Sequence, residues 1–478
     1  MAIPIVPLVV ATALFMENTD STILATALPT IARDLGLDPI SLKLAVTSYL
    51  VSLAVFIPVS GWVADRVGAR TTFRLALAVF MLASIGCAFS SSLAAFVFWR
   101  AVQGMGGAMM VPVGRMVVIR TVAKNELVRA LSFIAMPALI GPMLGPPIGG
   151  LIVSYADWRW IFFVNIPIGI LGIILATLYV PDIKQETPPL DLPGFVLCAL
   201  GLGGVILGAA MTGRHIAPIE VAVGCMLIGA VMLTGYVRHA LSVERPLIDL
   251  RLMRFKTFEA GILGGTFFRF GVGASAFLLP LMLQLGFGFD PLRSGLTTFA
   301  GAVGALLVKP LARSFLFRFG FRRLLIVNGL LAALTLMAFA LFKPTTPHVI
   351  ILGVLLLGGF LRSLEFTSLS AITYAELETR QISAATGMAS VAQQVSISLG
   401  VATGAMVLEI SEWLVGRQEP AVADFAAAFI VVGMVSALTS VLMLRLPADA
   451  GDEISGRSLP ARAPTASPSA HSVGGGSG

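Results

Sequence analysis

Fourteen stretches of apolar residues, each long enough to cross a lipid bilayer, follow one another along this chain. They fall at approximately 5–32, 41–64, 72–90, 93–120, 128–153, 159–180, 192–212, 217–237, 258–285, 293–316, 324–342, 347–373, 383–409 and 424–446. A membrane-spanning helix needs about 20 such residues. Only 12% of the 478 residues are charged, against about 25% in a typical soluble domain. We therefore predict an all-α polytopic membrane protein with 14 transmembrane helices, which excludes a water-soluble enzyme.

The basic residues predict how the chain crosses the membrane. If the N-terminus is cytoplasmic, twenty of the 32 Lys and Arg residues fall in cytoplasmic loops and the tail, seven on the opposite side and five inside spans. Cytoplasmic loops carry such an excess. We expect a multi-pass protein of the bacterial cytoplasmic (inner) membrane with both termini in the cytoplasm. The net charge of +7 then needs no nucleic-acid partner.

An internal repeat suggests how the spans are grouped. The segment 65–70 (DRVGAR) aligns with 317–322 (FRFGFR), which matches Arg66 to Arg318, Gly68 to Gly320 and Arg70 to Arg322. We predict a six-helix bundle over 1–181, two inserted helices with a basic connector over 182–256, and a second six-helix bundle over 257–446. Residues 447–478 are expected to be a disordered cytoplasmic tail that ends in a possible linker scar, GGGSG.

Four motifs in order carry a family resemblance. They are TDSTILATALP (19–29), GWVADRVGAR (61–70), RAVQGMGGAMMVPVGR (100–115) and ALIGPMLGPPIGG (138–150). The chain resembles the major facilitator superfamily, and within it the fourteen-span drug:proton antiporters. The resemblance implies two six-helix bundles plus two inserted helices, multidrug efflux driven by the proton gradient without a cofactor, and a monomer whose partners are protons, an amphipathic small molecule and membrane lipids.

The loop motif after the second span combines flexibility with charge. Gly61 and Gly68 permit a tight turn, while Asp65, Arg66 and Arg70 are placed to bridge helix ends. The resemblance implies conformational gating, in which these charges lock one state of the transporter and separate during its cycle. The alternative is a set of solvated charges that only fix the topology, which explains the arginines better than it explains Asp65.

The fifth span carries small residues at helical spacing. Glycines at these positions let another helix approach closely, and prolines soften the helix that contains them. The resemblance implies an antiporter motif near the interface between the bundles; ordinary close packing is the alternative. The residues concerned are Gly141, Pro142, Gly145, Pro146, Gly149 and Gly150.

Two carboxylates lie near the middle of the first span. Glu17 and Asp20 are three residues apart and therefore share one helical face. Charges at this depth are costly and usually functional, and a low dielectric favours the protonated carboxyl that a proton-coupled carrier requires. Asp20 matches the acidic position of the family's first-helix motif, which implies proton coupling or binding of a cationic substrate. Glu17 departs from that motif; it adds a second titrating group or pairs with an arginine.

Further charges are expected inside the bilayer. Arg100 opens the span-four motif, whose family role is proton transfer, and by depth it reaches the Glu17/Asp20 face; Gln103 continues that motif. In the second half Arg362 and Glu365 are three apart and can form an intrahelical ion pair. Otherwise Glu365 is a second proton site, and Arg362 or Arg269 contacts an anion.

These observations favour a proton-coupled antiporter that exports amphipathic, cationic drugs or toxic compounds by alternating access. The alternative carrier function is transport of an anionic metabolite or lipid through Arg269 and Arg362. A membrane scaffold or sensor without transport would not need the carboxylates at 17, 20 and 365. No catalytic or metal-ligand constellation is recognisable, so we expect neither an enzyme nor a metal site.

Overall fold

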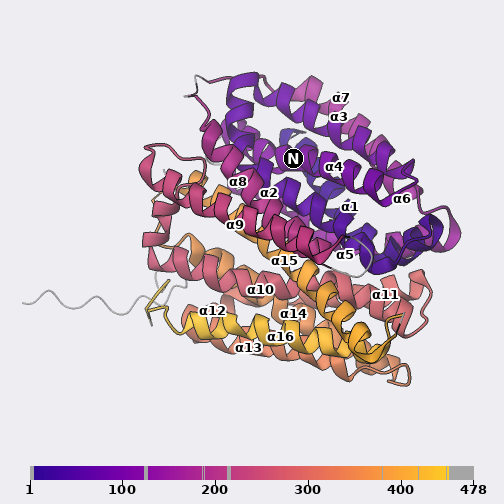
Figure 1. Ribbon diagram of the computed structural model, residues 1–478. Coiled ribbons are helices and arrows are strands. Elements are labelled where there is room, and N and C mark those ends of the chain that lie inside the picture. The colour runs from indigo at the N-terminus through magenta and orange to yellow at the C-terminus, as the bar shows by residue number, and fades with distance from the viewer. Residues whose placement is uncertain are drawn as a thin grey trace, which may run out of the picture.

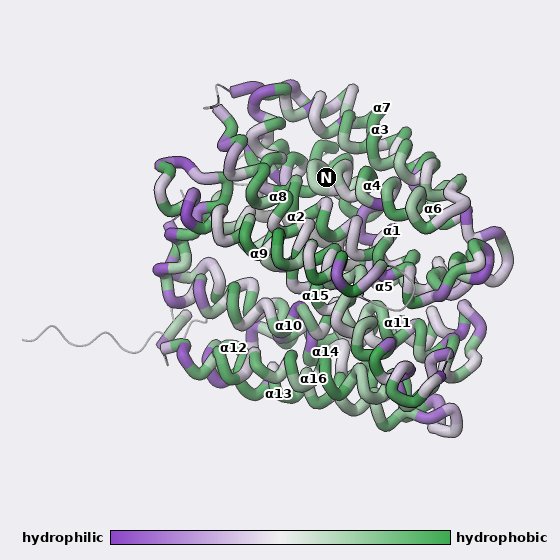
Figure 2. Tube along the Cα trace, in the orientation of Figure 1, coloured by the Kyte–Doolittle hydropathy of each residue, from purple (hydrophilic) through white to green (hydrophobic). Residues whose placement is uncertain are grey.

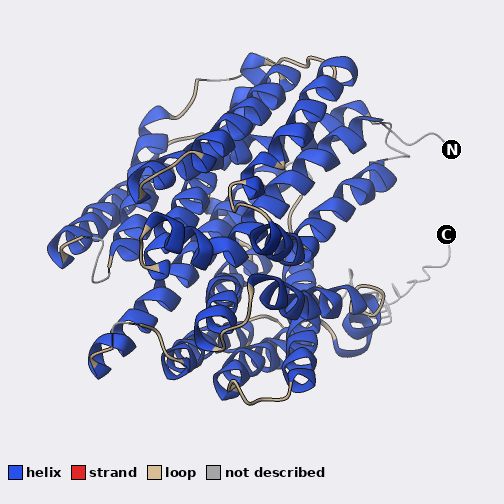
Figure 3. Ribbon diagram, turned by 90° about the vertical axis from the view of Figure 1, so that its right-hand side faces the viewer, coloured by secondary structure: helices blue, strands red, loops and turns tan. Residues whose placement is uncertain are grey.

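The computed structural model describes residues 5–122, 127–185, 187, 189–212, 217–378, 381–417, 419–447 and 449–451; for 127–139 and 383 it describes the backbone only. Throughout these ranges the regular structure is helical, without a strand (Figure 3). The first half comprises α1 (Ile5–Leu35), α2 (Lys43–Val67), α3 (Ala69–Ala88), α4 (Leu93–Thr121), α5 (Leu127–Tyr155), α6 (Trp160–Phe163) and α7 (Asn165–Tyr179). Two helices follow, α8 (Leu192–Met211) and α9 (Ile219–Ser242). The second half comprises α10 (Lys256–Leu281), α11 (Pro291–Leu307), α12 (Ala312–Phe319), α13 (Phe321–Ala338), α14 (His348–Thr373), α15 (Ile382–Val415) and α16 (Val422–Met443).

Most of these helices are long and apolar enough to cross a bilayer. In the described ranges eleven pass that test singly, and α11 with α12 passes as one bent span. Helices α1 and α5, of 31 and 29 residues, lie outside that count. The polytopic all-α fold is thus confirmed, while the number of fourteen spans stays a prediction.

The helices pack as two groups with the inserted pair between them. Helices α1–α7 form the upper part of Figure 1, α10–α16 form the lower part, and α8 and α9 lie along the boundary. Hydrophilic residues concentrate at the helix ends and connecting loops, while apolar residues cover the outer faces (Figure 2). Leu82, Leu178 and Val349 are among the exposed apolar side chains. Such a surface suits contact with lipid.

The two copies of the sequence repeat have the same backbone role. Gly68 separates α2 from α3 at φ +111°, and Gly320 separates α12 from α13 at φ +73°. Only glycine adopts these conformations without strain. We call the end of the molecule that holds both junctions the basic end, and the opposite end the distal end. The prediction for Gly61 was wrong: it lies within α2, so Gly68 alone makes the turn.

The predicted span 293–316 is not a straight helix. Helix α11 ends at Leu307, α12 starts at Ala312, and their axes differ by 58°. Pro310 lies in the break, where its ring and missing N–H prevent a continuous helix. The sequence-based boundary overlooked this proline because apolar runs on either side of Lys309 and Pro310 were read as one span.

The inserted helices are tied to each other by a capping residue. The Asp191 carboxylate, at the start of α8, accepts hydrogen bonds from the amides of Gly194 and Leu247 and lies 2.7 Å from Nε2 of His239 on α9. Burial opposes ionisation of this carboxyl, but the hydrogen bonds outweigh it and lower its pKa. The pair also packs on both halves, since Cys198 and Leu202 share an apolar cluster with Val51 of α2 and Met388 of α15.

The two halves meet closely at the distal end. Gly150 of α5 lies against Pro291 and Leu292 of α11, and Gly295 of α11 lies against the Pro146 carbonyl. Gln284, which follows α10, donates a hydrogen bond of 2.9 Å to the Thr26 carbonyl of α1. A large apolar cluster at this end combines residues of both halves. The distal end is therefore closed by packed side chains and backbone.

Candidate functional site

Asp20 is the centre of a buried polar network in the first half. Arg100 of α4 donates to its Oδ2 at 2.7 Å, and its Oδ1 accepts from Gln103 at 3.0 Å and from Asn165 of α7 at 2.7 Å. Ser84 of α3 accepts from the same two amides. Four helices thus converge on one carboxylate.

The network is buried and makes further contacts, although Nε of Arg100 has no hydrogen-bond partner in the described part of the chain. Arg100 also donates to Oε1 of Gln103, and its guanidinium lies 4.3 Å from the centre of the Tyr49 ring. A buried charge pair is tolerated when further hydrogen bonds satisfy both partners. The sequence placed Asp20, Arg100 and Gln103 in one region, and the structure brings them into contact. Sequence reasoning missed Asn165 and Ser84, although Asn165 is the only residue with a side-chain amide in the apolar segment 158–169.

Glu17 lies one turn before Asp20 and faces the same helix, α4. A Cβ built on Gly107 would lie 3.7 Å from Cγ of Glu17 and 3.2 Å from the Tyr49 hydroxyl. Glu17 Oε2 and the Tyr49 hydroxyl are both buried, and neither has a hydrogen-bond partner in the described part of the chain. The shared face was predicted, but the two carboxylates differ sharply in their surroundings.

The glycines of α5 form a seam against α1. A Cβ at Gly141 would approach Oγ1 of Thr19 to 3.0 Å, one at Gly145 would overlap Thr22, and one at Gly149 would approach the Ile23 carbonyl to 2.8 Å. Gly150 instead faces α11 of the other half. The helices approach as closely as the spacing suggested, and the role of this seam in antiport stays a prediction.

The loop motif is held within the first half. Asp65 forms an ion pair of 2.6 Å with Arg120 at the end of α4, and its carbonyl accepts from the amide of Gln185 at 2.9 Å. The Arg66 guanidinium lies 5.6 Å from the Trp62 ring, and Arg70 is partly exposed. Asp65 therefore bridges helix ends as expected, while the gating role of these charges stays a prediction.

The predicted pair of Arg362 with Glu365 is not formed. Glu365 is fully buried and accepts a hydrogen bond of 2.8 Å from Asn328 on α13. Its other oxygen lies toward Gly329 and has no hydrogen-bond partner in the described structure. Arg362 turns the opposite way, and its guanidinium donates to the Gly358 carbonyl at 3.3 Å and to Oγ of Ser275 on α10 at 3.3 Å. Although three residues apart, these side chains leave α14 toward different neighbours.

Arg269 is the most isolated charge in the second half. Its side chain lies mid-span on α10, is only 5% exposed, and faces the Phe366 ring of α14 at 5.9 Å. Neither Nε nor Nη1 has a hydrogen-bond partner in the described ranges. The sequence identified this residue by its depth alone, and the structure places it in the same α10–α14 interface as Arg362.

A charged contact across the two halves was missed by sequence reasoning. Lys43, at the start of α2, is fully buried; its ammonium donates to Glu409 of α15 at 2.9 Å and to the Thr212 carbonyl after α8 at 2.7 Å. We call this contact the distal latch. Lys43, near the start of the predicted span 41–64, is one of the seven basic residues that the sequence places on the side opposite the cytoplasm. Burial was the missing signal, and it becomes visible only when the halves are assembled.

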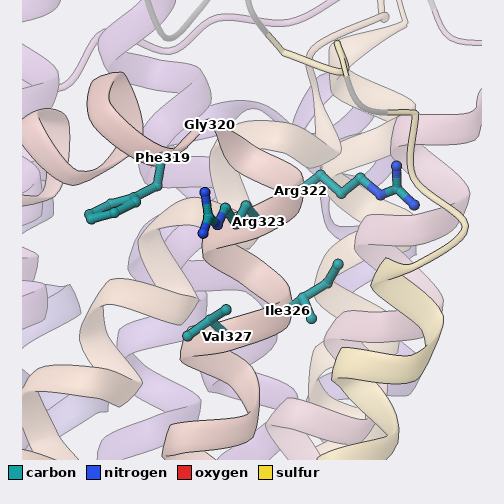
Figure 4. Close-up of a pocket in the computed structure, with 6 residues that line it drawn as sticks. All are labelled: Phe319, Gly320, Arg322, Arg323, Ile326 and Val327. Carbon is teal, nitrogen blue, oxygen red and sulfur yellow. The ribbon is translucent and has the colours of Figure 1, made fainter.

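One surface cavity lies apart from these charges. It has a volume of about 310 Å³ and opens at the junction of α12 and α13 (Figure 4). The lining residues are Phe319, Gly320, Arg322, Arg323, Ile326 and Val327. The Arg322 guanidinium also donates a hydrogen bond of 3.0 Å to the Leu444 carbonyl, which follows α16.

Comparison with known proteins identifies the family. The model of the Major Facilitator Superfamily matches residues 10–401 and, in a second match, 261–469. This chain belongs to the Major Facilitator Superfamily. Over 370 residues it is 38% identical to the putative multidrug resistance protein MdtD of Escherichia coli strain CFT073, covering 77% of this chain and 78% of that one. The protein of that name from Shigella boydii serotype 18 has the same identity and coverage.

Solved transporters of the superfamily share the fold. A crystal structure of a D-xylose-proton symporter aligns over 92% of this chain and 96% of its own, with a TM-score of 0.67 and 16% identity. A partially occluded inward open structure of the xylose transporter XylE from E. coli aligns over 92% and 97%, with a TM-score of 0.61 and 16% identity. This major facilitator protein is thus a multi-pass membrane protein and a transporter of small molecules rather than an enzyme.

Proposed function

We propose that this transporter exports amphipathic organic compounds in exchange for protons, by alternating access between two six-helix bundles. The observation that carries the proposal is the pair of carboxylates on α1, one turn apart, of which Asp20 is neutralised by Arg100 and Glu17 has a buried oxygen without a hydrogen-bond partner. The similarity to a putative multidrug resistance protein supports export of foreign compounds.

Glu17 is the group that we assign to exchange. An ionised carboxylate is costly to bury without a partner, so Glu17 is best satisfied by a proton or by the cationic end of a substrate. One site that takes either a proton or a cation, but not both, exchanges them. The sequence-based expectation gave Asp20 either proton coupling or binding of a cationic substrate. We assign the cation to Glu17 because both oxygens of Asp20 already accept hydrogen bonds from Arg100, Gln103 and Asn165.

Asp20 has a coupling role in this proposal. Protonation of Asp20 removes the counter-ion of Arg100 and weakens the contacts that hold α1, α4 and α7 together. Glu17 and Asp20 share α1, so the occupancy of one carboxyl affects the charge felt by the other. A proton on either group therefore changes the packing of α1, which also borders the glycine seam of α5.

We further propose that the basic end faces the cytoplasm of a bacterium, with the protein in its inner membrane. The arginine-rich junctions at Gly68 and Gly320 support this orientation. Within the described residues, the side-chain hydrogen bonds between the two halves, from Lys43 and Gln284, lie at the distal end. A substrate would therefore enter from the basic end in this conformation.

The test uses the purified full-length protein in proteoliposomes with an imposed pH gradient and tetraphenylphosphonium as the cationic probe. We expect gradient-driven transport of the probe to fall at least tenfold in Glu17→Gln and to collapse in Asp20→Asn. Glu244→Gln, which removes an exposed loop carboxylate, serves as the matched control and should transport normally. Wild-type rates in both α1 variants, at equal protein per vesicle, would refute proton coupling through these residues.

A further inference from the structure

Two guanidinium groups face the interface between α10 and α14 in the middle of the membrane-spanning region. Arg269 of α10 lies over Phe366 of α14, while Arg362 of α14 donates to Ser275 of α10. The helices run antiparallel, so Arg269 and Ser275 are about 9 Å apart along one axis and Arg362 and Phe366 about 6 Å apart along the other. The two positive charges therefore face one interface but are offset by about 6–9 Å along its axis.

These charges have no acidic partner in the described part of the chain. Ion pairs of 4.0 Å or less among described residues include neither Arg269 nor Arg362. Glu365 is the nearest carboxylate in sequence, but it turns to α13 and bonds Asn328. Two adjacent unpaired cations inside a bundle are unfavourable, and they become favourable when a ligand supplies negative charge.

The unused hydrogen-bond donors point to the same ligand chemistry. Nε and Nη1 of Arg269 are buried donors without acceptors, and a guanidinium binds carboxylates with directed hydrogen bonds. Phe366 is exposed beside Arg269 and provides an aromatic surface for an apolar group. Arg362 is accessible only in part and retains donors beyond its bonds to Gly358 and Ser275.

We infer that Arg269 binds the carboxylate group of an amphipathic substrate, whose apolar part packs against Phe366. The positive charge of Arg362 in the same interface adds to the attraction. The inference rests on the proposed function, because it extends the exported compounds from cations to molecules that carry a carboxylate. A zwitterion would then present its cationic end to Glu17 in the first half and its carboxylate to the second. A lipid headgroup is disfavoured, since both arginines lie at mid-span.

The experiment compares three probes of equal shape: 4-phenylbutyrate, its uncharged amide, and 4-phenylbutylamine. Their binding to the purified full-length protein is measured by calorimetry at pH 7.5 in nanodiscs of zwitterionic lipid, without a proton gradient. Hydrogen bonds to a charged group predict that 4-phenylbutyrate binds at least about tenfold more tightly than the amide. Equal affinities for the acid and the amide would overturn the inference.

Four variants assign the effect to the two arginines. Arg269→Gln should abolish the preference for the acid over the amide, and Arg362→Gln should reduce it. Two others leave both charges in place: a Cβ at Gly265 would overlap Nη1 of Arg269, and one at Gly301 would approach Nη2 of Arg362 to 3.2 Å. Gly265→Ala and Gly301→Ala should therefore weaken binding of the acid with little effect on folding. The matched control, Arg445→Gln, removes an exposed arginine of the same half and should bind as wild type.

Two further results separate this inference from the proposed function. Tight carboxylate binding that depends on Arg269, together with no gradient-driven transport in proteoliposomes, would support the site and refute the exporter. Normal tetraphenylphosphonium transport, together with equal affinities for the three probes, would support the exporter and refute the carboxylate site. Displacement of 4-phenylbutyrate when phosphatidylglycerol replaces part of the nanodisc lipid would overturn the assignment to a substrate, because it identifies a lipid headgroup as the occupant.

Discussion

The two halves of the transporter share a helical plan but treat buried charge in opposite ways. In the first half Asp20 and Arg100 neutralise each other within a hydrogen-bonded network drawn from four helices. In the second half Arg269 and Arg362 face the α10–α14 interface, Glu365 faces α13, and none of the three forms an ion pair with a described residue. We call the first half the satisfied half because Asp20 and Arg100 neutralise each other there, even though Glu17 keeps a buried oxygen without a described partner. We call the second half the incomplete half because its two buried arginines have no acidic partner among the described residues.

The same contrast appears at the basic end. Asp65 pairs with Arg120 in the first half, whereas the aligned position in the second half is Phe317, an exposed apolar residue. The two copies thus share the glycine that turns the chain and one arginine on each side of it, but only the first copy has the acidic residue. We conclude that duplication preserved the backbone geometry while the two halves diverged in charge, which is where substrate binding and coupling can differ.

The largest expected effect is in the satisfied half. Arg100→Met leaves the Asp20 carboxylate buried without its cation, which should destabilise the protein by about 3–5 kcal/mol. Unfolding by SDS in mixed micelles measures the change. The double variant Arg100→Met with Asp20→Asn should recover most of the loss, because it removes the uncompensated charge. Equal instability of the single and double variants would mean that packing of Arg100, and not its charge, stabilises this half.

The next effect concerns the distal latch between the halves. Lys43→Met removes a charged hydrogen bond to Glu409 and one to the Thr212 carbonyl, with an expected cost of about 1.5–3 kcal/mol to the closed distal end. Spin labels at the exposed positions Ser91 and Thr345 report on this end by pulsed electron resonance. The label distance should lengthen in Lys43→Met and in Glu409→Gln. An unchanged distance in both variants would show that apolar packing alone closes this end.

The incomplete half should respond in the opposite sense. Arg269→Met removes a buried cation without a partner and fills the space with an apolar chain, so the ligand-free protein should gain about 1 kcal/mol of stability. The measurement is the same SDS titration as for Arg100→Met. A loss comparable with that of Arg100→Met would indicate that Arg269 has a structural partner and would end the contrast between the halves.

The smallest effect is expected at the loop motif. Asp65 and Arg120 are both partly exposed, and such ion pairs contribute about 0–1 kcal/mol. Asp65→Asn should therefore unfold within 1 kcal/mol of wild type, while its rate of gradient-driven transport falls. Phe317→Ala, at the aligned position, provides the comparison and should leave the transport rate unchanged. If Asp65→Asn transports normally, these charges only set the topology.

Much of the fold followed from the sequence because lipid imposes a simple rule. A span of about 20 apolar residues must be a helix that satisfies its own backbone, so most helix boundaries were predicted within a few residues. The exception is the predicted span 293–316, which Pro310 divides into α11 and α12. The repeat was also recognised correctly at Gly68 and Gly320, because a positive φ leaves a sequence signature.

The site was predicted less completely, since depth along a helix is readable and direction is not. Asp20 and Arg100 were placed near each other because their spans carry motifs, and Arg269 was singled out by the cost of burying a charge. The spacing of Arg362 and Glu365 suggested a pair, but three residues leave about 60° between the two side-chain directions. Packing against α13 and α10 turned the two side chains apart. Lys43 and Glu409 are 366 residues apart, which no local pattern connects.

The contact of Lys43 with the Thr212 carbonyl has a consequence for protein engineering. Thr212 ends α8, so the inserted pair supplies one of the acceptors that hold an ammonium group in the apolar interior. Excision of residues 182–256, with residue 181 joined directly to 257, would remove that acceptor. It would also expose Val51 and Met388, which now pack against Cys198 and Leu202, to lipid. We therefore expect the shortened chain to be less stable than the full protein, which makes the inserted pair a structural part of this transporter.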